Sequence, residues 1–143
     1  MAVAIRFRSA VALLGRFPAL ADGLDDLERT TLTVLNRAVD FSALFRSVTT
    51  SAALKRLGMG DVQFAALLRD LASGSTPLIL IGNHDQPFGH WRISRTASGA
   101  DVLAGRIDRL AVVPLERWLG GVHLRLGAPL WRWDAERLSL VRS

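Results

Sequence analysis

The histidines are the side chains of this chain with the clearest capacity for metal or acid–base chemistry. His84, Asp85 and His90 share one polar loop, and three nitrogen and oxygen ligands from such a loop could hold zinc. Their spacing matches no strong metal motif, which leaves a metal-dependent enzyme with a His/Asp loop site as an alternative only. His123 could pair with a carboxylate such as Asp134, but no nucleophile is specified beside it. We therefore expect no catalytic residue, no bound metal and no cofactor.

A second group of polar and basic side chains has the right types for contact with nucleic acid. On an exposed helix, Gln63 and Arg69 could reach the edges of adenine and guanine. Lysine and arginine contact phosphates, and the candidates for that contact are Lys55, Arg56, Arg92 and Arg95. These six residues are the predicted contacts if the protein binds DNA.

The C-terminal segment carries aromatic and basic side chains at alternating positions. Trp131 and Trp133 fall on one face of an expected strand, and Arg132 falls on the other. The tryptophans could stack on bases with Arg125 and Arg132 near phosphate, or they could cover the hydrophobic flank of the helices. We favour the core position for the tryptophans, which leaves His123, Arg125 and Arg132 as a candidate surface.

The distribution of charge weighs against DNA as the main ligand. The chain has a net charge of +5, but residues 1–21 and residues 106–143 each carry +3. Residues 22–74 have six basic and seven acidic side chains, and residues 75–105 have two of each. Phosphate contacts supply much of the affinity for DNA through counterion release, so a neutral middle region would bind DNA weakly.

Three helices are expected in the first half of the chain. Asp25 and Glu28 form a capping-box pattern that starts the first helix, whose apolar stripe extends to Ala38. Asp40 caps a second, short helix, and Asp61 opens a third helix with a leucine-rich buried stripe. For the third helix we weigh a core helix with a solvated outer face against a DNA-recognition helix, and we favour the former.

Two strands and a fourth helix follow. Residues 78–81 and residues 91–94 are expected to be strands on either side of a polar loop, and Thr96 caps a helix that ends at Gly105. Three helices, a two-stranded wing and a closing helix are the order of a winged helix-turn-helix domain. We therefore predict an α+β fold with a winged-helix-like domain at residues 22–105.

Two regions flank this predicted domain. Residues 1–21 are expected to form a basic N-terminal helix, which would be the remnant of a longer protein if another domain precedes it. Residues 106–143 are expected to form a connector and a β-meander that packs on the domain. The alternating patterns place strands of this meander at 122–126, 130–134 and 138–142.

Several segments resemble an uncharacterised bacterial family, a domain of unknown function. In residues 117–134, the sequence RWLGGVHL followed by WRWD is similar to the end of that family's winged-helix-like region. FPALADGLDDLERTTL at 17–32, the leucine-rich block at 57–80 and RTASGADVLAG at 95–105 resemble other parts of it, so the resemblance covers roughly residues 14–143. The resemblance implies a winged-helix-like fold and a further N-terminal domain in full-length relatives. It implies no activity.

The leading hypothesis is a non-enzymatic winged-helix binding module of the bacterial cytoplasm. We expect it to bind a protein partner or a missing N-terminal domain, and the alternative is a DNA-binding transcriptional regulator that uses the third helix and the wing. The chain has no cysteine, which excludes disulfides and thiolate metal sites. The longest uncharged apolar stretch near the N-terminus is too short to span a bilayer, so no membrane contact is expected.

Overall fold

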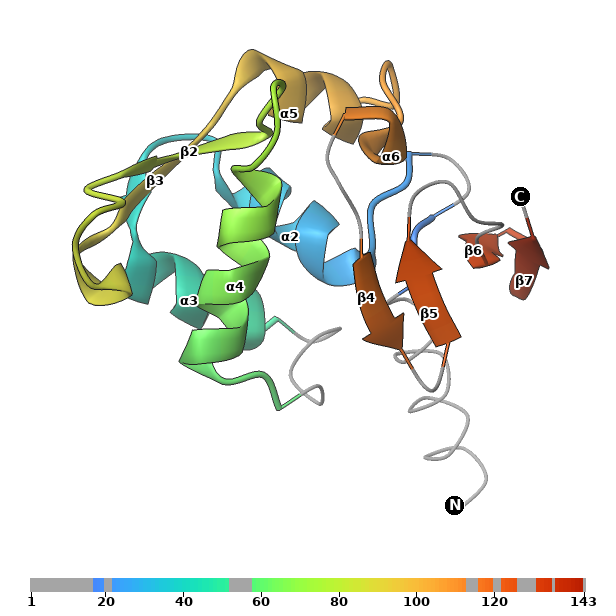
Figure 1. Ribbon diagram of the computed structural model, residues 1–143, viewed down its shortest axis with the longest axis horizontal. Helices are drawn as coiled ribbons and strands as arrows, with labels where there is room; N and C mark the ends of the chain where they lie inside the picture. Colours follow the sequence, from blue (N-terminus) through green and yellow to red (C-terminus); the bar gives the residue numbers. More distant parts are fainter. Residues whose placement is uncertain are drawn as a thin grey trace.

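The computed structural model of the chain describes residues 17–19, 22–51, 58–112, 116–119, 122–125, 131–134 and 136–142. Its fold is α+β, as expected: a group of helices packs with a small antiparallel sheet, and two β-hairpins lie to one side of the helices (Figure 1). Apart from residues 17–19, the expected basic helix at 1–21 lies outside the described residues. No helix in the described part of the chain is both long and apolar enough to cross a bilayer.

Three helices form the centre of the molecule: α2 (Asp26–Val34), α3 (Phe41–Thr49) and α4 (Asp61–Leu71). The predicted capping box at the start of α2 is confirmed. The Asp25 carboxylate accepts a hydrogen bond from the N–H of Glu28, and the Glu28 carboxylate accepts one from the N–H of Asp25. The predicted cap of α3 is also confirmed, because Asp40 accepts a hydrogen bond from the N–H of Ala43.

One continuous hydrophobic core lies between these helices and the sheet. The predicted stripe of α4 is buried, with Phe64, Leu67, Leu68 and Leu71 all facing the core. The outer face of the same helix is exposed, which both interpretations of the third helix, a core helix with a solvated face and a DNA-recognition helix, require. Trp91 also belongs to this core, with only 2% of its surface exposed.

A three-stranded antiparallel sheet packs against the helices, with strands β1 (Val39–Asp40), β2 (Ile79–Gly82) and β3 (Arg92–Arg95) in the order β1-β3-β2. Ile93 in the central strand pairs with Ile81 on one side and with Val39 on the other. The sequence predicted the β2–β3 hairpin and missed β1. A two-residue strand has no alternating pattern of its own, because only its pairing with β3 defines it.

The first helix is shorter than predicted. It ends at Val34, and the next residue, Leu35, leaves helical geometry with a ψ of 47° while its side chain stays buried. Ala38, which was expected to continue the helical stripe, is exposed and lies outside the helix. The pairing of Val39 with β3 pulls the chain away from the helix axis at this point.

The closing helix is α5 (Ala97–Leu103), and the short helix α6 (Arg109–Val112) follows it. Thr96 caps α5 through the N–H of Gly99, and Gly105 follows its end with a φ of 79°, as expected for a glycine stop. Gly99 is also needed for packing, because a Cβ atom there would collide with the carbonyl oxygen of Leu78. Helix α5 therefore lies directly against the residue that precedes β2.

Four further strands form two separate hairpins: β4 (Glu116–Leu119), β5 (Val122–Arg125), β6 (Trp131–Asp134) and β7 (Ser139–Arg142). The predicted single meander was therefore wrong, since β5 and β6 belong to different two-stranded sheets. Leu119 pairs with Val122, so only Gly120 and Gly121 separate β4 from β5 in the sequence. Strand β5 therefore pairs with the segment before it, where a connector was expected.

Polar contacts join the C-terminal residues to α2 and to the segment before it. Arg109 is fully buried, and its Nε and Nη2 atoms both lie 2.9 Å from the Glu28 carboxylate. Arg132 donates hydrogen bonds to the carbonyl of Ala19 and to the carboxylate of Asp108. Trp133 is buried, which confirms the core position predicted for it.

Candidate functional site

The outer face of α4 holds the two side chains that were predicted to read bases. Gln63 is exposed, but its side-chain oxygen accepts a hydrogen bond of 3.0 Å from the N–H of Gly60 and so caps α4. Arg69 is exposed as well, and its guanidinium carbon lies 4.9 Å from the centre of the Trp91 ring. This is a cation–π contact, so both side chains have a partner within the protein.

The two basic side chains of the β2–β3 hairpin differ in how freely they could reach a phosphate. Arg95 is half-buried and donates a hydrogen bond of 2.9 Å to the carbonyl of Leu32 in α2. Arg92 is exposed, and its contact with the carbonyl of Ala38 is long, at 3.4 Å. Of this pair, Arg92 is the one that can turn toward an external ligand at little cost.

The other residues predicted to contact nucleic acid or to form the C-terminal surface add little to a site that the structure describes. Lys55 and Arg56 lie outside the described residues. The backbone of His123 and Arg125 lies in β5, and their side chains are outside what the structure describes. Arg132 was expected on an outward basic face, but its guanidinium is held by a backbone carbonyl and a carboxylate and only 12% of the side chain is exposed. It therefore offers little to an external ligand.

The histidine loop does not gather ligands for a metal ion. His84, Asp85 and His90 are all exposed, and the described residues contain no group of three or more His, Cys, Asp or Glu side chains that could hold one. Asn83 orders this loop with a positive φ of 60° and donates its amide N–H to the carbonyl of His90. The alternative of a zinc site in this loop gains no support from the geometry.

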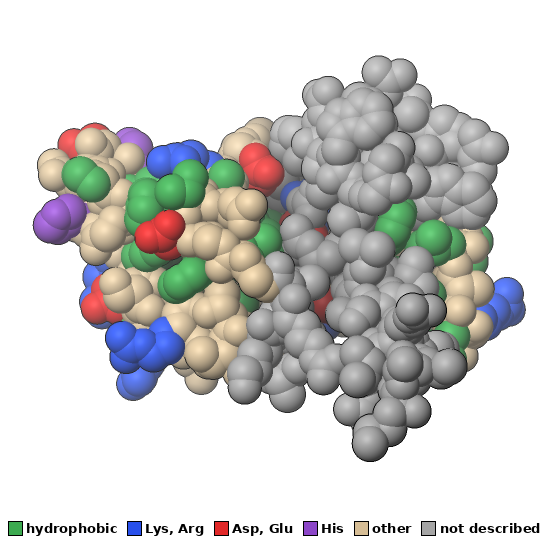
Figure 2. Space-filling view, turned by 90° about the horizontal axis from the view of Figure 1, so that it is seen from below, with side chains coloured by type: hydrophobic (Ala, Val, Ile, Leu, Met, Phe, Trp, Pro, Cys, Tyr) green, Lys and Arg blue, Asp and Glu red, His purple; other side chains and the backbone are tan. Residues whose placement is uncertain are grey.

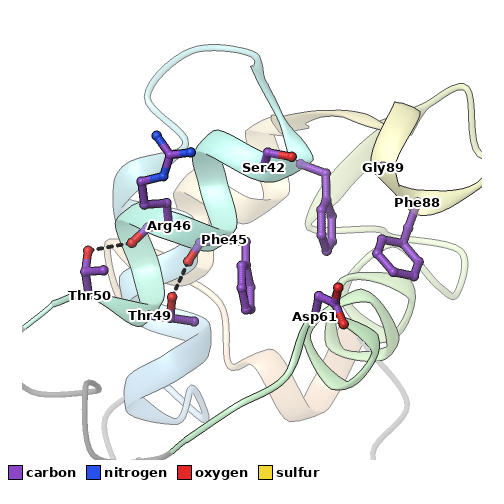
Figure 3. Close-up of a pocket in the computed structure, with 9 residues that line it drawn as sticks. Ser42, Phe45, Arg46, Thr49, Thr50, Asp61, Phe88 and Gly89 are labelled. Atoms are coloured by element: carbon purple, nitrogen blue, oxygen red, sulfur yellow. Dashed lines mark hydrogen bonds between the residues drawn. The ribbon is translucent and has the colours of Figure 1, made fainter.

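A pocket of about 470 Å³ lies between α3, the short 3-10 helix η2 (Phe88–His90) and the start of α4 (Figure 3). Its aromatic side chains are Phe41, Phe45 and Phe88, and the carboxylate of Asp61 lies beside them at the first residue of α4. The remaining lining residues are Ser42, Arg46, Thr49, Thr50 and Gly89. We refer to this site as the aromatic pocket.

The rings of the aromatic pocket are held by the core beneath them. The Phe41 ring lies 4.9 Å from the Phe88 ring and 6.1 Å from the Phe45 ring, in both cases between ring centres. Phe41 also meets the buried Trp91 edge-on at 6.2 Å, and Phe45 packs against Phe64 at 5.6 Å. These are ordinary separations for aromatic pairs, so the pocket has a preformed aromatic wall.

The charged residues of the aromatic pocket are placed differently. Asp61 is exposed, accepts a hydrogen bond from the N–H of Val62, and has no ion pair with another described residue. Arg46 lines the pocket from α3, but its guanidinium points away from the aromatic rings (Figure 3). The charge that faces the rings is therefore negative.

A second hollow, of about 380 Å³, lies where β2 meets α4. It is lined by Arg69 and Trp91 together with Leu80, Ile81 and His84, among others. Leu80 is 57% exposed, which is unusual for a leucine in a sheet. Because Arg69 is already stacked on Trp91, this hollow presents mainly apolar surface.

Sequence reasoning did not identify the aromatic pocket. Phe41 and Phe45 fit the apolar face of the short helix that Asp40 caps, and Phe88 lies in the polar loop that follows residues 78–81. The one available signal was Phe88 itself, because a large aromatic residue between Pro87 and Gly89 in a polar loop has no helical or strand pattern to place it in the core.

Figure 2 shows hydrophobic side chains on the helical part of the molecule with single acidic and basic side chains between them. Basic side chains do not gather into one extended area among the residues coloured in that view. The coloured part of this one face therefore lacks the continuous basic stripe of a typical DNA-binding face. Comparison with known proteins adds no relative: no family model, no curated protein and no solved structure matches this chain.

Proposed function

We propose that this protein is a non-enzymatic winged-helix module that binds a protein partner. The element order α2-β1-α3-α4-β2-β3-α5 and the strand order β1-β3-β2 support the winged-helix assignment. In this assignment α3 and α4 form the helix-turn-helix and the β2–β3 hairpin forms the wing. The same fold carries many functions, so the choice of partner depends on the surface.

The observation that carries the proposal is that side chains predicted to contact DNA already have contacts within the protein. Arg69 stacks on Trp91, Arg95 bonds to the end of α2, and Gln63 caps its own helix. A base or phosphate would have to replace each of these internal contacts, which lowers the net gain from binding. Asp61 and Asp70 add negative charge to the same helix, and they would repel the DNA backbone.

The surface has features that suit a protein partner. The aromatic pocket offers half-buried rings of Phe45 and Phe88, and the hollow over β2 offers the exposed Leu80. Buried aromatic and aliphatic anchors with a polar rim are the usual composition of protein interfaces.

DNA binding remains the competing function because Arg92 is exposed on the wing and weakly held. A titration of labelled duplex DNA at increasing salt separates the two proposals. We expect Kd values weaker than about 10 µM at physiological salt, with no dependence on Arg69→Ala or Arg92→Ala. Tighter binding with a steep salt dependence, lost in both variants, would overturn the protein-binding proposal.

A further inference from the structure

The aromatic pocket combines ring faces with a carboxylate that has no ion-pair partner among the described residues. Phe45 and Phe88 are both half-buried, so part of each ring remains open to a ligand. The face of an aromatic ring is electron-rich and attracts cations that lie over it. Asp61 adds a full negative charge at the edge of the same space (Figure 3). Both features attract a positively charged group.

The uncharged polar groups of the pocket favour a hydrogen-bond donor as the ligand. The Thr49 hydroxyl donates to the carbonyl of Phe45 at 2.6 Å, and the Thr50 hydroxyl donates to the carbonyl of Arg46 (Figure 3). A hydroxyl whose hydrogen is used in this way can only accept a further hydrogen bond. Together with Asp61, these groups present acceptors to the pocket, while the one guanidinium in its lining points elsewhere.

We propose that the aromatic pocket binds the arginine or lysine side chain of a protein partner. The methylene stem of such a side chain would lie against Phe45 and Phe88, and its charged end would reach Asp61. The proposal rests on the proposed protein-binding function and adds the chemistry of the partner. It commits to a basic segment because the charge that faces the pocket is negative.

The size of the pocket agrees with this occupant. Its volume of about 470 Å³ exceeds that of one basic side chain and leaves room for the neighbouring backbone. Pockets of roughly 300–1,000 Å³ are typical of sites that enclose a ligand. A guanidinium is planar and weakly hydrated, so it gives up less hydration free energy than an ammonium does when it stacks on a ring. We therefore expect arginine to bind more tightly than lysine.

The first experiment selects binders from displayed random short peptides with the full chain as the target. We expect the selected sequences to be enriched in arginine and lysine. A parallel selection with Asp61→Asn keeps the acceptor for the N–H of Val62 and removes only the charge. Asp70→Asn is the matched control, because Asp70 is an exposed carboxylate of the same helix outside the pocket.

The second experiment measures the affinity of one selected arginine peptide by fluorescence polarisation. Asp61→Asn should weaken binding about three- to fivefold, as expected for a partly exposed ion pair, and Asp70→Asn should leave it unchanged. Replacing the arginine by citrulline, its uncharged analogue, should weaken binding of the wild-type chain and have little further effect on Asp61→Asn. Phe88→Leu keeps an apolar wall and should weaken the arginine peptide through loss of the ring face.

Two outcomes would overturn this proposal in distinguishable ways. Selected peptides without basic residues, or binding that does not change in Asp61→Asn, would exclude the basic side chain while leaving protein binding in place. Absence of any peptide binding together with tight, salt-dependent binding of duplex DNA would remove the proposed function and this site with it. Unfolding curves of each variant check that the fold is intact, and Asp61→Asn tests the proposal even if Phe88→Leu does not fold.

Discussion

The buried ion pair between Arg109 and Glu28 should be the described ion pair whose disruption by a single substitution costs the most stability. The Arg109 side chain is fully buried and Glu28 is 2% exposed, with two guanidinium nitrogens 2.9 Å from one carboxylate oxygen. Arg109→Met removes the guanidinium but keeps an unbranched apolar side chain of similar reach. The Glu28 carboxylate then stays buried without this cation, which costs about 3–5 kcal/mol in comparable buried pairs.

Thermal unfolding followed by circular dichroism measures this cost. A change of 1 kcal/mol shifts the Tm of a chain of this size by about 2–4 °C, so Arg109→Met should lower the Tm by about 6–20 °C. The matched control is Asp101→Asn, which breaks the ion pair with Arg106. That pair is largely exposed, at 67% and 39%, and its loss should cost no more than about 1 kcal/mol.

A double variant tests the physical reason. Glu28→Gln keeps a side-chain oxygen for the capping bond to the N–H of Asp25 and removes the buried negative charge. The double variant Glu28→Gln/Arg109→Met should therefore be more stable than Arg109→Met alone, because the buried side chain that has lost Arg109 no longer carries a charge. Equal decreases in Tm for Arg109→Met and Asp101→Asn would refute the reasoning. Burial would then make no difference to the stability lost when an ion pair is broken.

Three further changes test the fold and the surface. Gly99→Ala should destabilise the protein by about 1–3 kcal/mol in urea unfolding, because its Cβ would collide with the carbonyl of Leu78. Gly89→Ala is the control, because a Cβ there meets open space and should leave the stability unchanged. Equal stability of the two variants would contradict the packing of α5. Asp25→Ala should cost about 1 kcal/mol through loss of the α2 cap, and no change in stability would argue against the capping box. Arg69→Ala should cost about 0.5–1 kcal/mol through loss of the contact with Trp91, and unchanged tryptophan fluorescence and stability would contradict that contact.

Local chemistry made several elements predictable from the sequence. Asp25, Asp40 and Thr96 each cap their helix through the residue three positions away, so the signal lies within one helical turn. The buried stripe of α4 follows from helical periodicity in the same way. The β2–β3 hairpin was predictable because an apolar strand precedes a polar loop and the short segment at residues 91–94 follows it.

Long-range pairing explains what the sequence did not reveal. Strand β1 exists only through its contact with β3, and the pairing of β5 with β4 depends on a partner segment that shows no strand pattern of its own. The engagement of Arg69 and Arg95 was also hidden, because their partners Trp91 and Leu32 lie on other elements. Residue type indicated what these side chains could contact, and their packing decided what they do contact.

The aromatic pocket was hidden for the same reason. Its walls come from α3, η2 and α4, and each contributes residues that have an ordinary explanation within their own segment. Phe41 and Phe45 fit the apolar face of a helix, and Asp61 fits the first turn of one. Their combination as a site follows only from the packing of three elements.

Chemical-shift mapping of the full chain with a selected arginine peptide is the most direct test of protein binding at the aromatic pocket. We expect the amide signals of Phe45, Asp61 and Gly89 to shift on addition of the peptide and these shifts to be smaller in Asp61→Asn. The same protein should show no comparable shifts with duplex DNA at physiological salt. Shifts that appear only with DNA, on the outer face of α4 and on the β2–β3 hairpin, would contradict it.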